Sequence, residues 1–504
     1  MVPGKVYLVG AGPGDPSLIT VRGKELLEKA EVVLHDSLSH PALLDFCSPS
    51  AELRNVGKRG GQKNPSQAWI TAQLVELARA GRRVVRLKGG DPLLFARGAE
   101  EAEDLAAAGV SFEIVPGIPS PVAAAAYAGI SLTHRELSSS ATFITGSDRE
   151  GVDWTPDAWH HLATATDTIC VLMGMRRLEE ITAAIVHGGR PPTTPAAIVQ
   201  WAARPSQRVL VATLGDIAAR ARAEGFTNPA LIFVGEVVTL RDNLRWYDRK
   251  PLFGKRLLVP RPLHQARETA SRIRERSAEP VVFPVIDIVD PPDPAPLERA
   301  LVELPSYDWV LFTSSNGVDR FFAALAKAGR DARAFGRALV GVIGPGTGAA
   351  LARYGVRADV VAREFVGEGL AREIAGARRV LIARALVARD ALPDALRSAG
   401  AHVDVVPVYR TVPAAPDKGA ELRHLLENDA LDVALFTSSS TVENVADLLG
   451  PDAPALLART TVASIGPVTS TTLTARQIRI DVTATTYTVD GLLDALEAHF
   501  TPSK

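Results

Sequence analysis

Short apolar runs rich in β-branched residues recur along the whole chain, and each is followed by a stretch rich in Ala, Leu, Glu and Arg. Examples are VVRLKGG from residue 84, VLFTSS from 310, RVLIARA from 379 and VALFTSS from 433. Strand-length runs that alternate with helix-length runs are typical of α/β layers. The pattern therefore predicts an α/β protein and argues against a helical bundle.

The second half of the chain repeats its own pattern. The matching segments are RLLVPRP and RVLIARA (256 and 379), YDWVLFTSSNGV and LDVALFTSSSTV (307 and 431), and ALVGVIGPGTGAALA and TTVASIGPVTSTTLT (338 and 460). This repeat predicts two related α/β lobes. Two further runs that correspond, VVFPVIDIVDPP and VDVVPVYRTVPA, carry prolines near both ends and suit strands that cross between the lobes. With two crossings, one lobe holds about 255–284 and 410–504, and the other about 285–409.

The segment RWYDRKPLFGKR, residues 245–256, has the composition of a linker. It is charged, contains a proline and a glycine, and precedes a fresh strand-like run. We therefore expect an N-terminal domain over 1–248 and a C-terminal domain over 255–504.

Composition narrows the classes of function. The 504 residues carry a net charge of -1, which argues against a nucleic-acid binder that depends on bulk electrostatics. The two cysteines, Cys47 and Cys170, are too few for a disulfide framework or a zinc site, and we expect them to be small buried residues. We expect no bound metal.

One uncharged segment, residues 114–132, is long enough to cross a membrane. Its three prolines and its many alanines favour a loop and a small-residue helix instead. The chain opens directly on a strand-turn pattern without a signal peptide, so we expect a cytoplasmic protein that does not bind membranes.

A glycine-rich turn follows the first apolar run, in VYLVGAGPGDPSL, and Asp36 ends the next run, VVLHD. This outline suggests a dinucleotide site, but the spacing is G-x-G-x-G and Asp15 stands where the last glycine of that motif belongs. Pro13 and Pro16 remove two N–H donors that phosphate would need. We therefore predict a ligand without phosphate. Two similar turns, LKGGDPLLFARG and VPGIPSP, also follow strand-like runs, so all three are expected to line one cleft.

Six ordered motifs in residues 4–245 resemble those of uroporphyrinogen-III C-methyltransferases, which have the tetrapyrrole methylase fold. They are VYLVGAGPGDPSLITVRG, VVLHDSL, VGKRGG, VVRLKGGDPLLFARGAEE, VPGI with AYAGISLTHR, and NPALIFVGEVV. The resemblance implies two α/β subdomains, about 1–138 and 139–248. It also implies S-adenosyl-L-methionine in the cleft between them, with S-adenosyl-L-homocysteine as product, and a homodimer formed through this domain.

The same resemblance assigns roles to residues. Asp36 and Lys58 match the proposed proton acceptor and donor. The cofactor contacts are Pro13, Gly89, Gly90, Asp91, Leu94, Pro119, Ser120, Met173, Ala202 and Ala230. Pro119 stands where the family usually has threonine and supplies no hydroxyl. Arg22, His134 and Arg135 either hold the acidic side chains of the substrate or form ordinary surface pairs.

The C-terminal half, residues 255–500, resembles uroporphyrinogen-III synthase through RLLVPRP, YDWVLFTSSNGV, GVIGPGTGAAL, VVPVYRT, LFTSSSTV and ASIGPVTS with TTYTVDGLL. The implied fold is two lobes joined by a two-strand ladder, in agreement with the repeat. Tyr409 either assists the loss of water or is simply a buried, satisfied tyrosine. The hydroxyl-rich junctions cap helices, bind substrate carboxylates or do both. The substrate-binding candidates are Thr313, Ser314, Thr437, Ser438, Thr469 and Tyr487.

Together the two resemblances imply a bifunctional enzyme of small tetrapyrroles. The C-terminal half would convert hydroxymethylbilane to uroporphyrinogen III, and the N-terminal half would methylate it at C2 and C7 to precorrin-2, for sirohaem, cobalamin and haem synthesis. Two alternatives stay open: the methyltransferase acts on another corrinoid or on ribosomal RNA, or the C-terminal half is a non-catalytic tetrapyrrole-binding or regulatory module.

Overall fold

The computed structural model describes residues 4–48, 50–57, 66–146, 155–261, 263–363, 367–374, 376–413 and 417–501. The chain divides into two compact units. The first comprises Met1–Arg256 with the short segments Arg272–Glu279 and Leu496–Lys504, and the second comprises Leu257–Ser271 and Pro280–Ala495.

The first unit begins with a parallel five-stranded sheet in the order β3-β2-β4-β1-β5. Its strands are β1 (Lys5–Gly10), β2 (Val32–His35), β3 (Glu52–Asn55), β4 (Arg83–Lys88) and β5 (Phe112–Val115). The helices are α1 (Val21–Lys29), α2 (Gln67–Arg79), α3 (Gly98–Ala107) and α4 (Ser120–Ala128), with 3-10 turns η1 (Pro16–Leu18) and η2 (Pro41–Phe46). Because β1 lies between β4 and β5, the three glycine-rich turns leave adjacent strands at their carboxyl ends, where ligands bind in such sheets.

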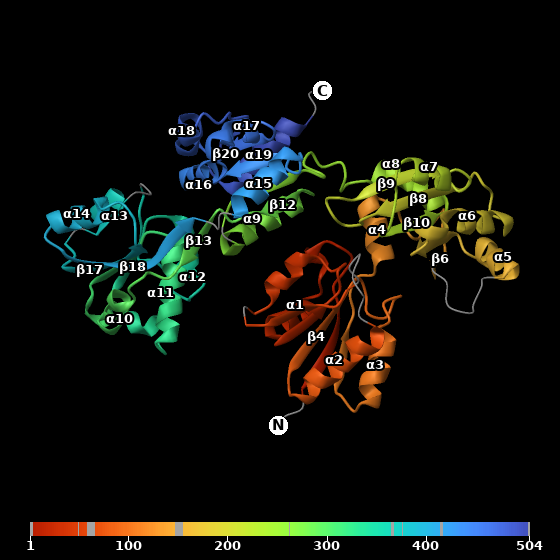
Figure 1. Cartoon of the computed structure of the whole chain (residues 1–504), viewed down its shortest axis with the longest axis horizontal. Helices are drawn as coiled ribbons and strands as arrows, with labels where there is room; N and C mark the ends of the chain where they lie inside the picture. The colour runs from red at the N-terminus through yellow and green to blue at the C-terminus, as the bar shows by residue number, and fades with distance from the viewer. Residues whose placement is uncertain are drawn as a thin grey trace. The chain divides into compact units, whose positions relative to one another are not determined.

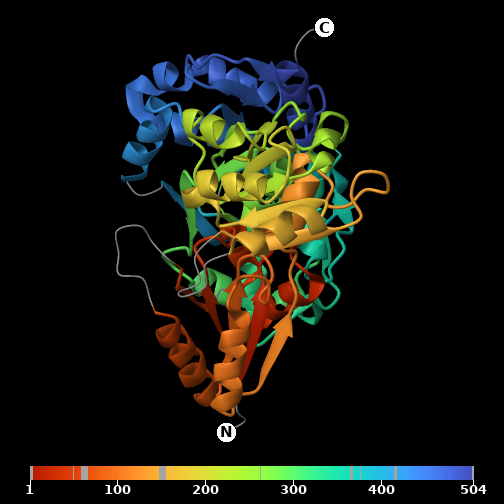
Figure 2. The same ribbon diagram turned by 90° about the vertical axis from the view of Figure 1, so that its right-hand side faces the viewer.

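Alternation along each strand gives this sheet two apolar faces. Leu8 and Leu34 point to the face covered by α2 and α3, while Val9 and Val33 point to the face covered by α1 and η2. The helices α2 and α3 lie side by side (Figures 1 and 2). Burial on both faces explains why these strands are nearly continuous apolar runs in the sequence.

A second five-stranded sheet, ordered β6-β7-β10-β8-β9, completes the first unit. Its strands are β6 (Ala141–Thr145), β7 (Thr168–Leu172), β8 (Pro195–Gln200), β9 (Arg208–Thr213) and β10 (Ala230–Val234), and the helices are α5 (Pro156–Ala165), α6 (Leu178–His187), α7 (Ile217–Ala223) and α8 (Arg241–Leu244). Strand β10 runs antiparallel to both its neighbours, so the sheet is mixed. The alanines of α4 pack against one face of this sheet.

The uncharged segment 114–132 thus contains the end of β5, a loop and the buried helix α4. Among the described residues, no helix is both long and apolar enough to span a bilayer. Cys170 is buried and Cys47 half-buried, and both thiols are free. The described residues contain no cluster of His, Cys, Asp and Glu that could hold a metal ion.

The C-terminal half contains two sheets, as the internal repeat predicts. The first, in the order β12-β11-β19-β20-β21, is formed by β11 (Arg256–Val259), β12 (Glu279–Val282), β19 (Val433–Phe436), β20 (Thr461–Ser464) and β21 (Val482–Thr483). Its helices are α9 (Leu263–Glu275), α15 (Asp417–Glu427), α16 (Ser439–Leu449), α17 (Ala453–Leu457), α18 (Pro467–Ala475) and α19 (Val489–Phe500).

The second sheet, in the order β13-β18-β17-β14-β15-β16, is built from the middle of that half. Its strands are β13 (Ile286–Val289), β14 (Trp309–Phe312), β15 (Leu339–Val342), β16 (Val360–Val361), β17 (Arg379–Ala385) and β18 (His402–Pro413). Its helices are α10 (Ala295–Val302), α11 (Ser315–Lys327), α12 (Pro345–Ala352), α13 (Gly367–Glu373) and α14 (Ala391–Ser398).

The two Pro-flanked runs of the sequence pair with each other. Strands β13 and β18 are antiparallel, with Ile286 opposite Pro413 and Val289 opposite Arg410, and they lie side by side in Figure 1. Strand β18 has 12 residues, long enough for its first part to pair in parallel with β17 and its last part with β13. The predicted α/β fold, with two lobes joined by a two-strand ladder, is confirmed.

Candidate active site

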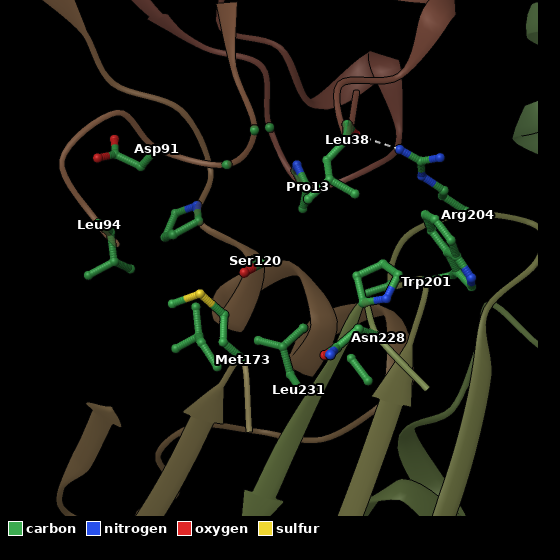
Figure 3. Close-up of a pocket in the computed structure, with 18 residues that line it drawn as sticks. Pro13, Leu38, Asp91, Leu94, Ser120, Met173, Trp201, Arg204, Asn228 and Leu231 are labelled. Carbon is green, nitrogen blue, oxygen red and sulfur yellow. Dashed lines mark hydrogen bonds between the residues drawn. The ribbon is translucent and has the colours of Figure 1, made fainter. Parts of the chain in front are cut away.

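A cavity of about 340 Å³ is lined by residues from both subdomains of the N-terminal half (Figure 3). All ten residues that the sequence resemblance assigns to the cofactor lie in its wall. Pro13, Asp91 and Pro119 come from the loops that follow β1, β4 and β5. Met173 follows β7 and Ala230 begins β10, both in the second subdomain. The three glycine-rich turns therefore do converge on one cleft.

The glycines bring these turns together rather than form a phosphate cradle. A Cβ on Gly10 would lie 2.5 Å from the Cα of Gly117 and 2.7 Å from the carbonyl oxygen of Gly90, closer than real Cβ contacts. Gly12 and Gly90 exchange two backbone hydrogen bonds of 3.2 and 2.9 Å, and both have positive φ. Only residues without a side chain allow the backbones to approach so closely.

Asp15, which distinguishes this turn from a dinucleotide motif, has a structural use. Its Oδ1 accepts a hydrogen bond of 2.8 Å from the backbone N–H of Ser17 and so caps η1. Its Oδ2 accepts a second hydrogen bond of 2.8 Å from the hydroxyl of Tyr127 on α4. Burial, with the nearby carboxylate of Asp15, raises the pKa of Tyr127, which keeps the hydroxyl protonated as a donor.

Asp91 connects two walls of the cavity. Its Oδ1 accepts from the N–H of Leu93 at 2.8 Å, and its Oδ2 accepts from the N–H of Gly117 at 3.0 Å. One carboxylate therefore holds the loop after β4 against the loop after β5.

Eight further lining residues were not among the predicted contacts, including Leu38, Trp201, Arg204, Asn228 and Leu231. The guanidinium of Arg204 donates 2.6 Å to the carbonyl of Leu38 and lies 5.1 Å from the ring centre of Trp201 (Figure 3). Trp201 and Met173 have positive φ, a strained conformation for such residues that clusters at functional sites. No sequence signal marks these positions, because neither strain nor a cross-subdomain contact has a local pattern.

Asp36, the expected proton acceptor, follows β2 and is held by a buried arginine. Nη2 of Arg86 donates 2.6 Å to Oδ1 of Asp36, whose side chain is 28% exposed, whereas that of Arg86 is 3% exposed. Among the described residues, Asp36 receives a side-chain hydrogen bond only on Oδ1. Lys58, the expected proton donor, lies outside the described residues.

The three residues expected to hold the substrate's acidic groups do not line this cavity. Arg22 forms ion pairs with Glu113 at 3.0 Å and with Glu25 at 3.6 Å. His134 closes a tight turn through its backbone and its ring Nδ1, and Arg135 is exposed. Their substrate role stays a prediction.

In the C-terminal half, two of the expected residues meet. The hydroxyl of Tyr409, a buried residue of β18, lies 3.1 Å from the hydroxyl of Ser314. Ser314 also accepts from the N–H of Gly317 at 3.0 Å and so caps α11, while Thr313 precedes it in the chain.

The remaining candidates lie on loops at the carboxyl ends of β19, β20 and β21, or on the helices that follow, at one edge of their sheet. Ser438 caps α16 through the N–H of Thr441, and Thr469 is buried in α18. The ring of Tyr487 packs over Gly466 while 64% of the residue stays exposed. Oγ1 of Thr437 is buried and has no hydrogen-bond partner among the described residues.

Two different protein families match the two halves of the chain. Residues 5–218 match the family model of Tetrapyrrole (Corrin/Porphyrin) Methylases, and residues 267–494 match that of Uroporphyrinogen-III synthase HemD. Porphyrin biosynthesis protein HemD of Ruminiclostridium josui is 37% identical over 500 residues, which is 98% of each chain. Uroporphyrinogen-III C-methyltransferase of Bacillus subtilis is 38% identical over 66% of this chain and 68% of its own length.

Among solved structures, uroporphyrin-III C-methyltransferase of Thermus thermophilus complexed with S-adenyl homocysteine is 40% identical. It covers 47% of this chain and 100% of its own, with a TM-score of 0.40. The Ruminiclostridium protein matches this chain over 98% of its length, and both family models match the same polypeptide. The chain therefore belongs to the family of porphyrin-biosynthesis proteins that join a tetrapyrrole methylase to a uroporphyrinogen-III synthase.

Proposed function

We propose that this chain catalyses two successive reactions of tetrapyrrole synthesis. The C-terminal half converts hydroxymethylbilane to uroporphyrinogen III, and the N-terminal half methylates that product at C2 and C7 to precorrin-2. The observation that carries the proposal is that one polypeptide holds both family domains, in a match that spans 98% of a porphyrin-biosynthesis protein. The product of one half is then the substrate of the other.

The N-terminal cavity suits S-adenosyl-L-methionine, which has no phosphate. Apolar side chains, including Leu94, Met173 and Leu231, form much of its wall, and the Asp91 carboxylate would repel a phosphate group. When bound, this co-substrate supplies an electrophilic methyl group. The residues of the wall orient it, and their apolar surfaces keep water from the methyl group.

Methylation of a pyrrole carbon requires a proton to leave the ring system afterwards. Asp36 lies two residues before Leu38, which lines the cavity, and only one oxygen of its carboxylate is bonded to Arg86. Its second oxygen can accept a proton or steer a pyrrole N–H. Lys58 is assigned the complementary donor role by family resemblance.

Ring closure by the C-terminal half depends mainly on positioning. A linear octacarboxylate must be folded so that its last ring closes inverted, and holding its ends together supplies most of the rate enhancement. We assign Tyr409 to assisting the departure of the hydroxyl group, since its own hydroxyl is already oriented by Ser314. The hydroxyl-bearing loops of both lobes bind the carboxylates.

We also propose a homodimer formed through the methyltransferase domain and a cytoplasmic location, with 1–248 and 255–504 as the two domains. The dimer rests on family resemblance, and analytical ultracentrifugation of residues 1–248 and of the full chain tests it.

The activity test uses the full chain and hydroxymethylbilane, with and without S-adenosyl-L-methionine, followed by oxidation and chromatography of the products. We expect type III uroporphyrin without the co-substrate and dimethylated product with it. If only type I porphyrin forms without the co-substrate, the synthase assignment is wrong. If uroporphyrinogen III supplied directly gives no methylated product, the methyltransferase assignment is wrong.

A further inference from the structure

Four charged side chains form a continuous network from the interior of the first sheet to Asp36, just after the carboxyl end of β2. Lys88 donates 2.8 Å to Oε1 of Glu101, Nε of Arg86 lies 3.3 Å from the same oxygen, and Nη2 of Arg86 lies 2.6 Å from Asp36. The side-chain exposures of Lys88, Arg86 and Glu101 are 2%, 3% and 0%. Charges of alternating sign therefore lead from a fully buried lysine to the partly exposed carboxylate of Asp36.

Glu101 lies at the centre of this network of four charged side chains. Its Oε1 also accepts 2.8 Å from the side-chain amide of Gln67, so a single oxygen receives three donors. Its Oε2 is buried and finds no partner among the described residues. A buried carboxylate with an unused oxygen is costly to maintain, and its presence calls for an explanation beyond packing.

Glu101 helps to fix the orientation of the Arg86 guanidinium. The guanidinium is held at Nε by Glu101, and its Nη1 donates 3.4 Å to the carbonyl of Leu34 and 3.3 Å to that of Leu87. Only the Nη2 side remains for Asp36. The fixed guanidinium in turn determines which oxygen of Asp36 is occupied, because Arg presents its donors in a rigid planar fork.

The balance of charge supports the same reading of the network. Lys88 and Arg86 carry two positive charges, and Glu101 alone offsets one of them. The carboxylate of Asp36, at the end of the network, supplies the second negative charge. Burial lowers the pKa of Lys88, with the charge of Arg86 adding to this effect and that of Glu101 opposing it.

We propose that Glu101 is a positioning residue for methyl transfer, which acts through Arg86 to fix the orientation of the Asp36 carboxylate and leave its second oxygen available. The inference rests on the proposed proton-accepting function of Asp36. It predicts that Glu101 affects the chemical step and leaves co-substrate binding nearly unchanged, since Glu101 does not line the cavity.

The test is a double-mutant cycle with D36N, E101Q and the combined variant, assayed as methylation of uroporphyrinogen III. We expect E101Q to lower kcat at least about tenfold, a loss typical of residues that orient a reacting group through hydrogen bonds, with the KM for S-adenosyl-L-methionine within about twofold. In the D36N background, E101Q should lower kcat no further, because the residue through which it acts is gone. Glu103, exposed on the same helix α3, provides the matched control E103Q, which should behave like wild type.

Each outcome decides between the claims. An unchanged kcat in E101Q, or equal losses in the wild-type and D36N backgrounds, overturns the inference while leaving the function of Asp36 intact. An unchanged kcat in D36N refutes the proposed role of Asp36, and this inference with it, while the methyltransferase activity itself stands. If E101Q does not fold, the variant that combines K88M with E101Q keeps the buried charges balanced and serves in its place, and a wild-type kcat there also overturns the inference.

Discussion

Replacing Gly10 by alanine tests whether the glycine-rich turn is a packing device. The new Cβ would lie 2.5 Å from two backbone atoms of Gly117 and 2.7 Å from the carbonyl oxygen of Gly90. Carbon atoms pack at about 3.5–4.0 Å, so the loops must separate by roughly 1 Å. Main-chain atoms cannot rotate away as a side chain can. We therefore expect a loss of stability near the usual 1–3 kcal/mol for overpacking.

Binding should suffer as well, because Gly90 lies in the wall of the cavity and the loop of Gly117 supplies other parts of that wall. If the displaced loops weaken the binding free energy by about 1.4–2.8 kcal/mol, the affinity falls by roughly 10- to 100-fold. Isothermal titration with S-adenosyl-L-homocysteine measures the affinity, and thermal unfolding measures the stability.

The matched control is G346A in the synthase half. No atom lies within 4 Å of a Cβ built on Gly346, and its φ is not positive. This substitution should change stability by no more than about 0.5 kcal/mol and leave ligand binding as in wild type. If G10A binds and melts like G346A, the glycine is not needed for close approach and the packing argument fails.

Four other variants give separate checks. D91N should weaken S-adenosyl-L-homocysteine binding about tenfold by titration, because an amide cannot accept from both backbone N–H groups that Asp91 holds. Y409F removes the bond to Ser314 and should cost about 0.5–1.5 kcal/mol in unfolding free energy while slowing hydroxymethylbilane consumption. T437V should slow the same reaction without lowering the melting temperature, since the hydroxyl has no partner in the fold. Burial lowers the pKa of His40 to about 4, so the folded protein holds this ring neutral while the unfolded chain protonates it below about pH 6.5. The free energy of unfolding is therefore unaffected by His40 above pH 6.5 and falls as the pH drops from about 6.5 to 4. H40N should therefore reduce the loss of melting temperature between pH 7 and pH 5, and an unchanged loss would contradict this assignment.

The cavity lining was predictable where its residues follow strands. In a parallel sheet the carboxyl ends of neighbouring strands share an edge, so Pro13, Asp91 and Pro119 could be placed together from apolar runs and turn residues alone. Trp201 and Arg204 could not be placed in the cavity from the sequence. Their positions depend on a strained backbone and on a contact between subdomains, and neither feature has a period in the sequence.

The fold shows a similar division. The internal repeat predicted two lobes, and the two sheets and the β13–β18 ladder confirm them. The sequence pattern could not predict the strand directions in the sheet of β6 to β10. Strand β10 reads as a buried apolar run whether its neighbours are parallel or antiparallel, because burial on both faces removes alternation in either case.

The synthase half is harder because helix capping and carboxylate binding use the same residue types. Ser314 and Ser438 both cap helices, so the fold alone explains a serine at each position. Thr437 differs from them: it caps no helix, and its buried Oγ1 lacks a partner among the described residues. A buried hydroxyl that the fold does not use carries a desolvation cost, and a substrate carboxylate would satisfy it. Of the hydroxyl residues that the repeat singles out, Thr437 is therefore our first candidate for a contact with the substrate.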